Sequence, residues 1–274
     1  MTSMNIHIIS FGTTGVSRHF RDYSKHLARI ESNVLRLGLT CTIYTQESPA
    51  FKESVLGQNA YPMRKGAGYW SWKPDLILDA ASRNPGKLIL YIDADWDLRS
   101  VPDDIFSIRN SYSGLSLIRI DHKVVDWTSK RCLDFYGIDK LNDSLCFIAS
   151  VILLDTSNRI ALSAMISWKQ AMQDYKLLLD PFFTTRQNHR HDQSILNCLV
   201  VKNAVQCSEL PQTTYVEGVS SESSYESAWL RTVRNSTPRT IRSSILKIRS
   251  TIFAKFELFR FILHISVIRK LRSS

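Results

Sequence analysis

A run of three aspartates, Asp93, Asp95 and Asp97, directly follows the apolar segment KLILYI. Residues two apart on an extended chain point to the same side, so Asp93 and Asp95 are expected to present two carboxylates to one ion. Mg²⁺ and Mn²⁺ bind carboxylate and phosphate oxygens together. Such an ion would neutralise the charge that develops on a diphosphate leaving group. The alternative interpretation is a solvated acidic turn after a strand.

These aspartates need a strand to place them, and the sequence predicts that strand and several others. Apolar runs predict strands at Asn5–Ser10, Thr40–Thr45, Lys87–Ile92, Leu115–Ile120 and Cys146–Leu154. Apolar residues at steps of three and four predict helices at 20–37, Pro74–Ser82, Asn158–Leu179 and Gln193–Val201. This alternation predicts an α/β fold with a mostly parallel sheet flanked by helices. Ligands of such sheets bind beyond the carboxyl ends of the strands, where Asp93 and Asp95 lie.

The positive charge of the chain is concentrated at one end. The 274 residues carry a formal net charge of +10. Residues 231–274 contain eleven of the 35 Lys and Arg and one of the 25 Asp and Glu, which leaves 24 of each in the rest of the chain. We therefore divide the chain into a domain, 1–230, and a basic tail, 231–274. The neutral body argues against nucleic acid as a partner.

The cysteines and the N-terminal sequence predict the cellular compartment of the protein. The five cysteines have neither metal-ligand nor redox spacing, and most lie in apolar runs, which fits a reducing compartment. The N-terminus lacks the charged-then-apolar order of a signal peptide, and no uncharged apolar run is long enough to predict a spanning helix. A cytoplasmic location is expected.

Four segments together resemble a known class of enzyme. The segment KLILYIDADWDL is similar to the Asp-X-Asp segment of GT-A glycosyltransferases, particularly family 8 of the galactosyltransferase and glycogenin type. CFIASVILLD (Cys146–Asp155) resembles the family's strand with a small residue near the donor sugar, and HDQSILN (His191–Asn197) resembles its Asp-Gln segment. GAGYWSWKPDLIL (Gly66–Leu78) is similar to a Gly-Tyr-Trp-X-Trp-Lys-Pro motif of bacterial capsule and lipopolysaccharide transferases. The resemblance covers roughly residues 1–200.

The resemblance implies a nucleotide-diphosphosugar donor, with a UDP-sugar favoured, and a glycan or lipid-linked acceptor. Asp93 and Asp95 would hold the metal and the diphosphate, with Mn²⁺ or Mg²⁺ as cofactor. Asp192 would hydrogen-bond the transferred sugar or the acceptor hydroxyl, and Gln193 would lie near the anomeric carbon. Lys73 would pair with a phosphate or with an active-site acid.

The sequence departs from family 8 at the third metal ligand. That family supplies a histidine near its C-terminus, whereas the only histidine after His191 here is His264, inside the basic tail. His189 or His191 would have to substitute. Relatives with the Trp-Lys-Pro motif often carry Gly in place of the second Asp. The resemblance therefore implies the fold without supplying a full set of metal ligands.

Asp192 is the candidate for proton transfer. In an inverting enzyme it would act as general base on the acceptor hydroxyl, and together with Gln193 and Asp95 it forms the candidate catalytic set. The alternative is that Asp192 is the N-cap of the helix that follows. His189, Arg190 and His191 are candidate diphosphate contacts, because cationic side chains suit phosphate oxygens.

The remaining candidates concern donor binding. Ser10, Phe11 and Gly12 stand at the end of the first predicted strand, where a GT-A enzyme holds its nucleobase. Gly68 would permit close backbone approach. Trp70 and Trp72 flank Ser71 and would share a side if the segment is extended. They form either a stacking surface for base or sugar or a packed aromatic plug.

The basic tail predicts a membrane contact. Between residues 239 and 272, Ile, Leu and Phe recur at helical steps with Lys and Arg mainly between them. A basic amphipathic helix with Phe anchors is typical of a peripheral contact with an anionic membrane surface, here the inner face of the cell membrane. The alternative is a helix packed on the domain.

The sequence thus predicts a transferase of bacterial surface polysaccharide synthesis. The alternatives are a nucleotidyl- or phosphotransferase and a non-catalytic nucleotide-sugar-binding membrane protein.

Overall fold

A six-stranded sheet of order β2-β1-β3-β6-β5-β7 forms the centre of the protein. This computed structural model describes residues 5–15, 22–54, 66–101, 103–178, 189–210 and 230–232. The strands of the sheet are β1 Ile6–Phe11, β2 Thr40–Tyr44, β3 Leu88–Ile92, β5 Leu115–Lys123, β6 Leu145–Asp155 and β7 Ser208–Glu209. Of these six strands, β6 alone runs antiparallel to its neighbours β3 and β5. The predicted α/β fold with a mostly parallel sheet is confirmed.

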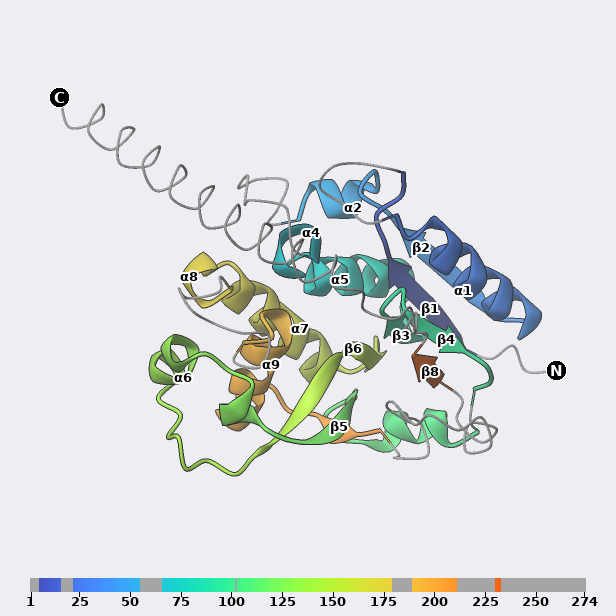
Figure 1. Ribbon diagram of the computed structural model, residues 1–274. Coiled ribbons are helices and arrows are strands. Elements are labelled where there is room, and N and C mark those ends of the chain that lie inside the picture. Colours follow the sequence, from blue (N-terminus) through green and yellow to red (C-terminus); the bar gives the residue numbers. More distant parts are fainter. Residues whose placement is uncertain are drawn as a thin grey trace, which may run out of the picture.

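Helices cover both faces of the sheet (Figure 1). The helices are α1 Ser24–Arg36, α2 Pro49–Lys52, α4 Gly66–Tyr69, α5 Lys73–Arg83, α6 Lys130–Tyr136, α7 Arg159–Met172, α8 Tyr175–Leu178 and α9 Asp192–Val201, with 3-10 turns η1 Asp103–Asn110 and η2 Val124–Asp126. One apolar cluster joins the sheet to α5, α6, α7 and α9, and a second joins its other face to α1 and η1. Alternate strand residues enter opposite clusters: Ile89 and Tyr91 the first, Leu88 and Leu90 the second. This burial on both faces explains why β3 is a continuous apolar run.

One predicted helix is wrong in its length. The single helix expected over Asn158–Leu179 is divided into α7 and α8. The break falls at Gln173 and Asp174, where the Asp174 carboxylate accepts a hydrogen bond from the Lys176 amide at 2.9 Å. An aspartate in this position starts a new helical turn by satisfying an amide that has no partner within the helix.

A second, two-stranded sheet extends the fold beside the aspartates. β4 (Trp96–Leu98) pairs antiparallel with β8 (Leu230–Thr232), and Thr232 lies opposite Trp96. The expected boundary between domain and tail at residue 230 therefore falls inside β8. The rest of the tail, including the proposed membrane helix at 239–272, lies outside the described residues.

His7 on β1 is buried between two hydroxyl groups of β2. Its Nδ1 and Nε2 each lie 2.8 Å from a hydroxyl oxygen, of Thr40 and Thr42 respectively. Burial, and secondarily the positive charge of Lys87, lower the pKa of His7 from its ordinary value of 6.5. The fold therefore favours the neutral ring.

We expect His7 to make the protein less stable in mild acid. Because the pKa is lower in the folded state, the stabilising contribution is present above pH 6.5 and is lost as the pH falls toward the folded-state pKa. His7→Gln keeps polar groups near both hydroxyls but cannot take up a proton. Urea unfolding at pH 7.5 and pH 5 should show a smaller loss of stability on acidification for the variant than for the wild type. Equal losses would contradict this expectation.

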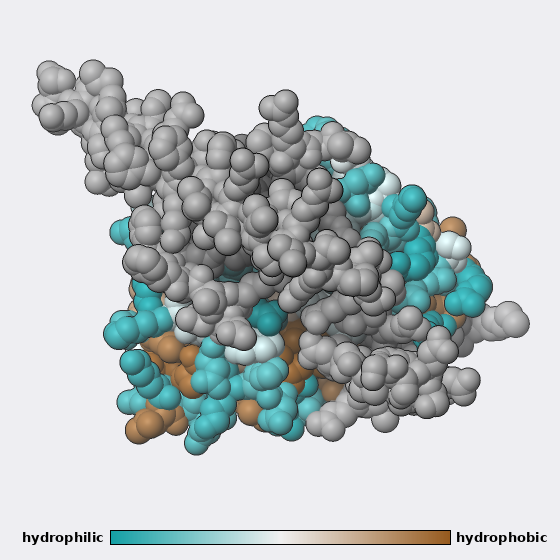
Figure 2. Space-filling view, in the orientation of Figure 1, coloured by the Kyte–Doolittle hydropathy of each residue, from teal (hydrophilic) through white to brown (hydrophobic). Residues whose placement is uncertain are grey.

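On the face shown in Figure 2, hydrophilic residues make up most of the described surface. Figure 2 shows mostly teal residues outside the grey parts, with brown patches toward the lower edge. Large hydrophobic side chains that are exposed are Leu35, Tyr112, Phe135, Leu141, Ile166 and Tyr175. The five cysteines are free. Among the described residues, no helix has the length and apolar character needed to cross a membrane.

Candidate functional site

A buried ammonium group joins the two acidic segments. Nζ of Lys73 lies 2.7 Å from Oδ2 of Asp192 and 3.2 Å from Oδ1 of Asp93, and it donates to the carbonyl oxygen of Ala149 at 2.9 Å. The Lys73 side chain is only 2% exposed, that of Asp192 7%, and that of Asp93 22%. Three protein oxygens thus surround the ammonium: two carboxylate oxygens at ion-pair distance and one carbonyl oxygen that accepts a hydrogen bond. The structure thus brings together three residues that sequence reasoning had selected from separate motifs.

Four elements of the fold place this cluster. Lys73 is the first residue of α5, with Pro74 next to it, a position where proline is favoured. Asp93 follows the carboxyl end of β3, and its amide donates to the Ser150 carbonyl of β6 at 2.9 Å. Asp192 is the first residue of α9. The cluster therefore lies at the edge of the sheet where strand β3 ends, as predicted.

Asn197 fixes the helix that carries Asp192 and was missed by sequence reasoning. Its carboxamide accepts from the Phe147 amide at 2.6 Å and donates to the Phe147 carbonyl at 2.7 Å, so it pairs with β6 as a neighbouring strand would. Trp168 on α7 adds a bond from Nε1 to the Asp192 carbonyl at 3.2 Å. The signal in the sequence was Asn197 itself, a polar residue on the buried side of an apolar helix.

The charges of the cluster do not cancel. Lys73 supplies one positive charge against two carboxylates, inside the fold. Burial raises the pKa of Asp192 to about 6, with Asp93 adding to the rise, although the Lys73 ammonium opposes it. Burial by itself would lower the pKa of Lys73, but the charges of Asp192 and Asp93 outweigh burial and the pKa is raised. Lys73 therefore stays protonated, and Asp192 takes up a proton more readily than an ordinary aspartate.

The segment Asp93-Ala94-Asp95 is a turn, which corrects the expectation of an extended chain. The Trp96 amide donates to the Asp93 carbonyl at 3.0 Å, closing a β-turn between β3 and β4. Arg29 of α1 stabilises it by donating to the carbonyls of Trp96 at 3.1 Å and Ala94 at 3.4 Å. Strand alternation therefore does not place the Asp93 and Asp95 side chains on one side. Arg29 was not found from the sequence, because its contact depends on the docking of α1.

Tyr91 is a further partner of Asp93 that sequence reasoning missed. Its hydroxyl donates to Asp93 Oδ1 at 2.5 Å. Burial first, and then the charge of Asp93, raise the pKa of Tyr91 well above its ordinary value, so the hydroxyl stays protonated. The signal was available: Tyr91 and Asp93 are two residues apart at the end of one strand.

The candidate metal ligands are Asp93 and Asp95, with His189 or His191 as the candidate third ligand. Among the described residues, no group of three or more His, Cys, Asp and Glu side chains is arranged to hold an ion. His189 is engaged through both ring nitrogens, with the Ser129 amide at 3.3 Å and the Leu177 carbonyl at 2.8 Å. Carboxylates at a strand end fit the mode in which one or two acids bind Mg²⁺ and the substrate phosphates complete its shell. Asp93 and Asp95 have the residue type for that mode, although Oδ1 of Asp93 is in contact with Lys73 and Tyr91.

Asp192 is not the N-cap of α9, so the alternative interpretation is wrong. The N-cap position belongs to His191, and no side chain caps the helix. The Asp192 carboxylate is directed to Lys73 instead. Gln193, the next residue, is also buried, and its Nε2 has no hydrogen-bond partner among the described residues.

The Gly-Tyr-Trp segment forms a left-handed turn. Ala67, Gly68, Tyr69 and Trp70 have consecutive positive φ values of 48°, 98°, 57° and 59°. The left-handed conformation costs an L-residue about 1–2 kcal/mol, so it is rare in a run. The segment is not extended, and Trp70 and Trp72 do not share a side by alternation.

Gly68→Ala should destabilise the protein, because a side chain at φ 98° is strained. We expect a loss of about 1–2 kcal/mol in the free energy of unfolding, measured by urea denaturation. Ala67→Gly is the matched control, since it removes a Cβ from the same turn and should not lower the stability. Equal stability of Gly68→Ala and wild type would contradict the left-handed turn.

The candidates at the end of β1 divide into two kinds. Phe11 and Trp72 are buried and lie with ring centroids 4.0 Å apart, and Phe51 stacks on Phe11 at 4.8 Å. For Trp72 these contacts are those of the packed aromatic plug. Ser10 is fully buried, and its hydroxyl has no hydrogen-bond partner among the described residues. Gly12 has no room for a side chain, because a Cβ there would lie 2.7 Å from Tyr23.

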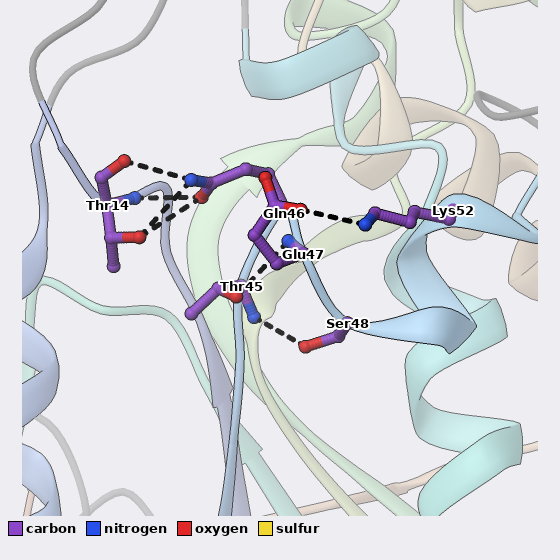
Figure 3. Close-up of polar contacts among 6 residues, drawn as sticks. All are labelled: Thr14, Thr45, Gln46, Glu47, Ser48 and Lys52. Carbon is purple, nitrogen blue, oxygen red and sulfur yellow. Dashed lines mark hydrogen bonds and ion pairs between the residues drawn. The ribbon is translucent and has the colours of Figure 1, made fainter.

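Gln46 ties together the loops that follow β1 and β2, as Figure 3 shows. Its Oε1 accepts from the Thr14 amide at 2.9 Å, and its Nε2 donates to the Thr14 carbonyl at 2.9 Å. The Thr45 amide donates to the Ser48 hydroxyl at 2.9 Å, which shapes the second loop. Gln46 and Thr14 were not predicted. They fix the edge of the sheet beside the aspartate turn.

Comparisons with known proteins give likeness of shape only. No family model and no curated protein matches the sequence. Solved structures with a similar shape include the apo form of mouse xyloside xylosyltransferase 1, at 14% identity and a TM-score of 0.44 over 76% of this chain and 85% of that one. Another is a glycosyltransferase involved in glycosylation of the major capsid of PBCV-1, at 13% identity and a TM-score of 0.43 over 76% and 82%.

Proposed function

We propose that this chain is a glycosyltransferase. It would move a sugar from a nucleotide-diphosphosugar, with a UDP-sugar favoured, to a glycan or lipid-linked acceptor of a bacterial surface polysaccharide. The carrying observation is that one buried lysine, Lys73, contacts both the Asp93 carboxylate and the Asp192 carboxylate. The acid expected beside the diphosphate and the acid expected beside the acceptor thus share one cation. The resemblance of four sequence segments supplies the substrate class.

The chemistry divides between the two acids. The acceptor oxygen would form a bond to the anomeric carbon while the bond from that carbon to the diphosphate oxygen breaks. Asp192 would accept the proton of the acceptor hydroxyl, a task that suits a carboxylate whose pKa lies close to the working pH. A divalent cation bound by Asp93 and Asp95, when present, would neutralise the departing diphosphate. Lys73 would hold Asp93 and Asp192 in place through its two ion pairs.

The edge formed by β1 and β2 supports a base-binding surface. The two loops are fixed to each other by Gln46 and Thr14, and the Ser10 hydroxyl lies at the same strand end. Preformed edges of this kind lower the entropy lost on binding. We assign the nucleobase of the donor to this edge, together with Gly12.

A thermal-shift screen tests the donor. Nucleotide-sugars would be added with and without Mn²⁺ or Mg²⁺, and a donor present at about 100 times its Kd should stabilise the fold by about 2.7 kcal/mol. Asp93→Asn and Asp95→Asn should lose this effect. Asp143→Asn, which removes an acid whose side chain is 79% exposed, is the control and should retain it. Absence of binding by every nucleotide-sugar would refute the proposal.

The products separate the two alternative functions from this one. Release of a nucleoside diphosphate supports glycosyl transfer, whereas release of pyrophosphate indicates a nucleotidyltransferase. Binding of the donor with neither hydrolysis nor transfer over a broad acceptor panel indicates a non-catalytic binding protein.

The position of the basic tail is relevant to the kind of acceptor that the protein would use. Thr232 lies opposite Trp96 in the β4–β8 pair, so the basic tail begins beside the Asp93–Trp96 turn. If residues 239–272 bind an anionic membrane surface from the cytoplasmic side, the candidate site is tethered close to lipid-linked acceptors. Flotation with vesicles that contain or lack anionic lipid tests this. Equal recovery with both vesicle types, or none with either, would refute the membrane contact.

A further inference from the structure

The backbone of His191 is held in a conformation that bulky residues rarely adopt. Its φ and ψ are 49° and −108°, and the Gln193 amide donates to the Arg190 carbonyl at 3.0 Å. These angles belong to the first central residue of a type II′ turn, which is normally glycine. Such strain persists only where the surroundings fix it, and it is concentrated at functional sites. The residue after this strained position is Asp192.

Contacts with the imidazole ring hold His191 in this conformation. Its Nδ1 lies 2.7 Å from the Leu178 carbonyl oxygen. The ring centroid lies 4.8 Å from that of Tyr69 and 5.8 Å from that of Trp70, the latter nearly parallel at 24°. His189 meets it edge-on at 5.1 Å. The ring is therefore packed from several directions.

The two aromatic residues belong to the segment that supplies Lys73. Tyr69 and Trp70 lie in the left-handed turn, and the Lys73 amide donates to the Trp70 carbonyl at 3.1 Å. The ring stack of Trp70 and His191 thus joins the same two segments as the ion pair of Lys73 and Asp192. Two strained backbones meet through these rings, and the charged groups lie beside them.

We propose that Tyr69 and Trp70 are positioning residues that act through His191 to hold Asp192 on Lys73. This inference rests on the proposed function, since it assigns the purpose of the Gly-Tyr-Trp turn to the acid that takes the acceptor proton. It differs from a stacking surface for base or sugar, because it gives the rings the task of holding His191, which they contact. The strained turn fixes the rings, the rings fix His191, and His191 fixes the start of α9.

The inference predicts a loss of turnover without a loss of donor affinity. A misplaced catalytic group can lower a rate on the order of 10²-fold for about 1 Å of displacement. Tyr69→Leu and Trp70→Leu should therefore lower kcat on the order of 10–100-fold and leave KM for the donor nearly unchanged. Tyr69→Phe and Trp70→Phe keep a ring and should restore most of kcat. Phe106→Leu, a partly buried residue of the other apolar cluster, is the matched control for a lost ring and should keep kcat.

A second measurement is independent of transfer. The Lys73 ammonium is protected by its burial, so acylation of its amine, followed by mass spectrometry, should be slow in the wild type. If the rings hold Asp192 on Lys73, Tyr69→Leu and Trp70→Leu should raise the labelling rate at Lys73 at least tenfold under conditions where urea unfolding shows them folded. Phe106→Leu should not.

The outcomes separate the inference from the proposed function. A rise in KM with kcat unchanged would overturn the inference in favour of a substrate-stacking surface. Unchanged labelling of Lys73 in both leucine variants would overturn it whatever the activity. If the wild type transfers no sugar but the leucine variants expose Lys73, the proposed function fails and the positioning contact stands.

Discussion

Lys73→Met is expected to cause the largest loss of stability of any single substitution in the site. Methionine matches the length of the lysine chain but leaves the Asp93 and Asp192 carboxylates without their shared cation. Breaking a buried ion pair by removing one partner typically costs 3–5 kcal/mol, because it leaves an uncompensated buried charge. Here two carboxylates also repel each other. We therefore expect a loss of about 3–5 kcal/mol in the free energy of unfolding, measured by urea denaturation.

The control for Lys73 is another lysine that pairs with an aspartate. Nζ of Lys130 lies 2.5 Å from Asp134, and the two side chains are 68% and 58% exposed. Exposed pairs contribute about 0–1 kcal/mol, so Lys130→Met should have a small effect. Adding Asp192→Asn to Lys73→Met should recover part of the loss, because one of the two repelling charges is then removed. A loss for Lys73→Met no larger than for Lys130→Met would show that the cluster is not a buried ion network.

Asp192→Asn is expected to have the largest effect on activity. Asparagine has the shape of aspartate, and its carbonyl oxygen can still accept a hydrogen bond from Lys73, so the fold should be retained. It cannot accept the proton of the acceptor hydroxyl. Loss of general-base catalysis lowers rates by about 10²–10⁴-fold, and we expect a fall of that size in kcat for sugar transfer, with little change in donor binding.

Asp155→Asn provides the matched control for Asp192→Asn. Asp155 is also a buried aspartate, but its carboxylate accepts from the amide and hydroxyl of Ser157, at 2.9 and 2.7 Å, away from the cluster. It should lower stability without lowering kcat in the folded protein. Transfer by Asp192→Asn at a rate close to that of the wild type would exclude Asp192 as the base. Hydrolysis of the donor, measured alongside, shows whether the variant still binds it productively.

The strands were predictable because a strand buried on both faces has a mostly apolar sequence, which can be read from that short segment alone. β3 and most of β6 are buried on both faces, so each appears as a nearly continuous apolar run that can be read directly from the sequence. β1 is buried throughout although it contains His7 and Ser10. Helix lengths were less certain. The break between α7 and α8 depends on Asp174, a single polar residue in an otherwise regular pattern.

The site was partly predictable for a different reason. Asp93 and Asp192 stand in short segments that resemble motifs of one enzyme class, and Lys73 was expected to meet a phosphate or an acid. The contacts of Arg29, Tyr91, Asn197 and Gln46 were not expected, since each residue acts on a segment brought near by the sheet order or by helix docking. The residue types of these four positions do not by themselves indicate the contacts.

The sequence alone thus determined the α/β class, the edge of the sheet at which the candidate site lies, and the acids that stand there. Apolar periodicity and residue type decide these features, and both are properties of short segments. Only the tertiary structure decided that Lys73 joins Asp93 to Asp192, that Asp93-Ala94-Asp95 is a turn, and that His191 is held in a strained conformation. Each depends on partners from distant segments, whose placement follows from how the strands are ordered and the helices packed.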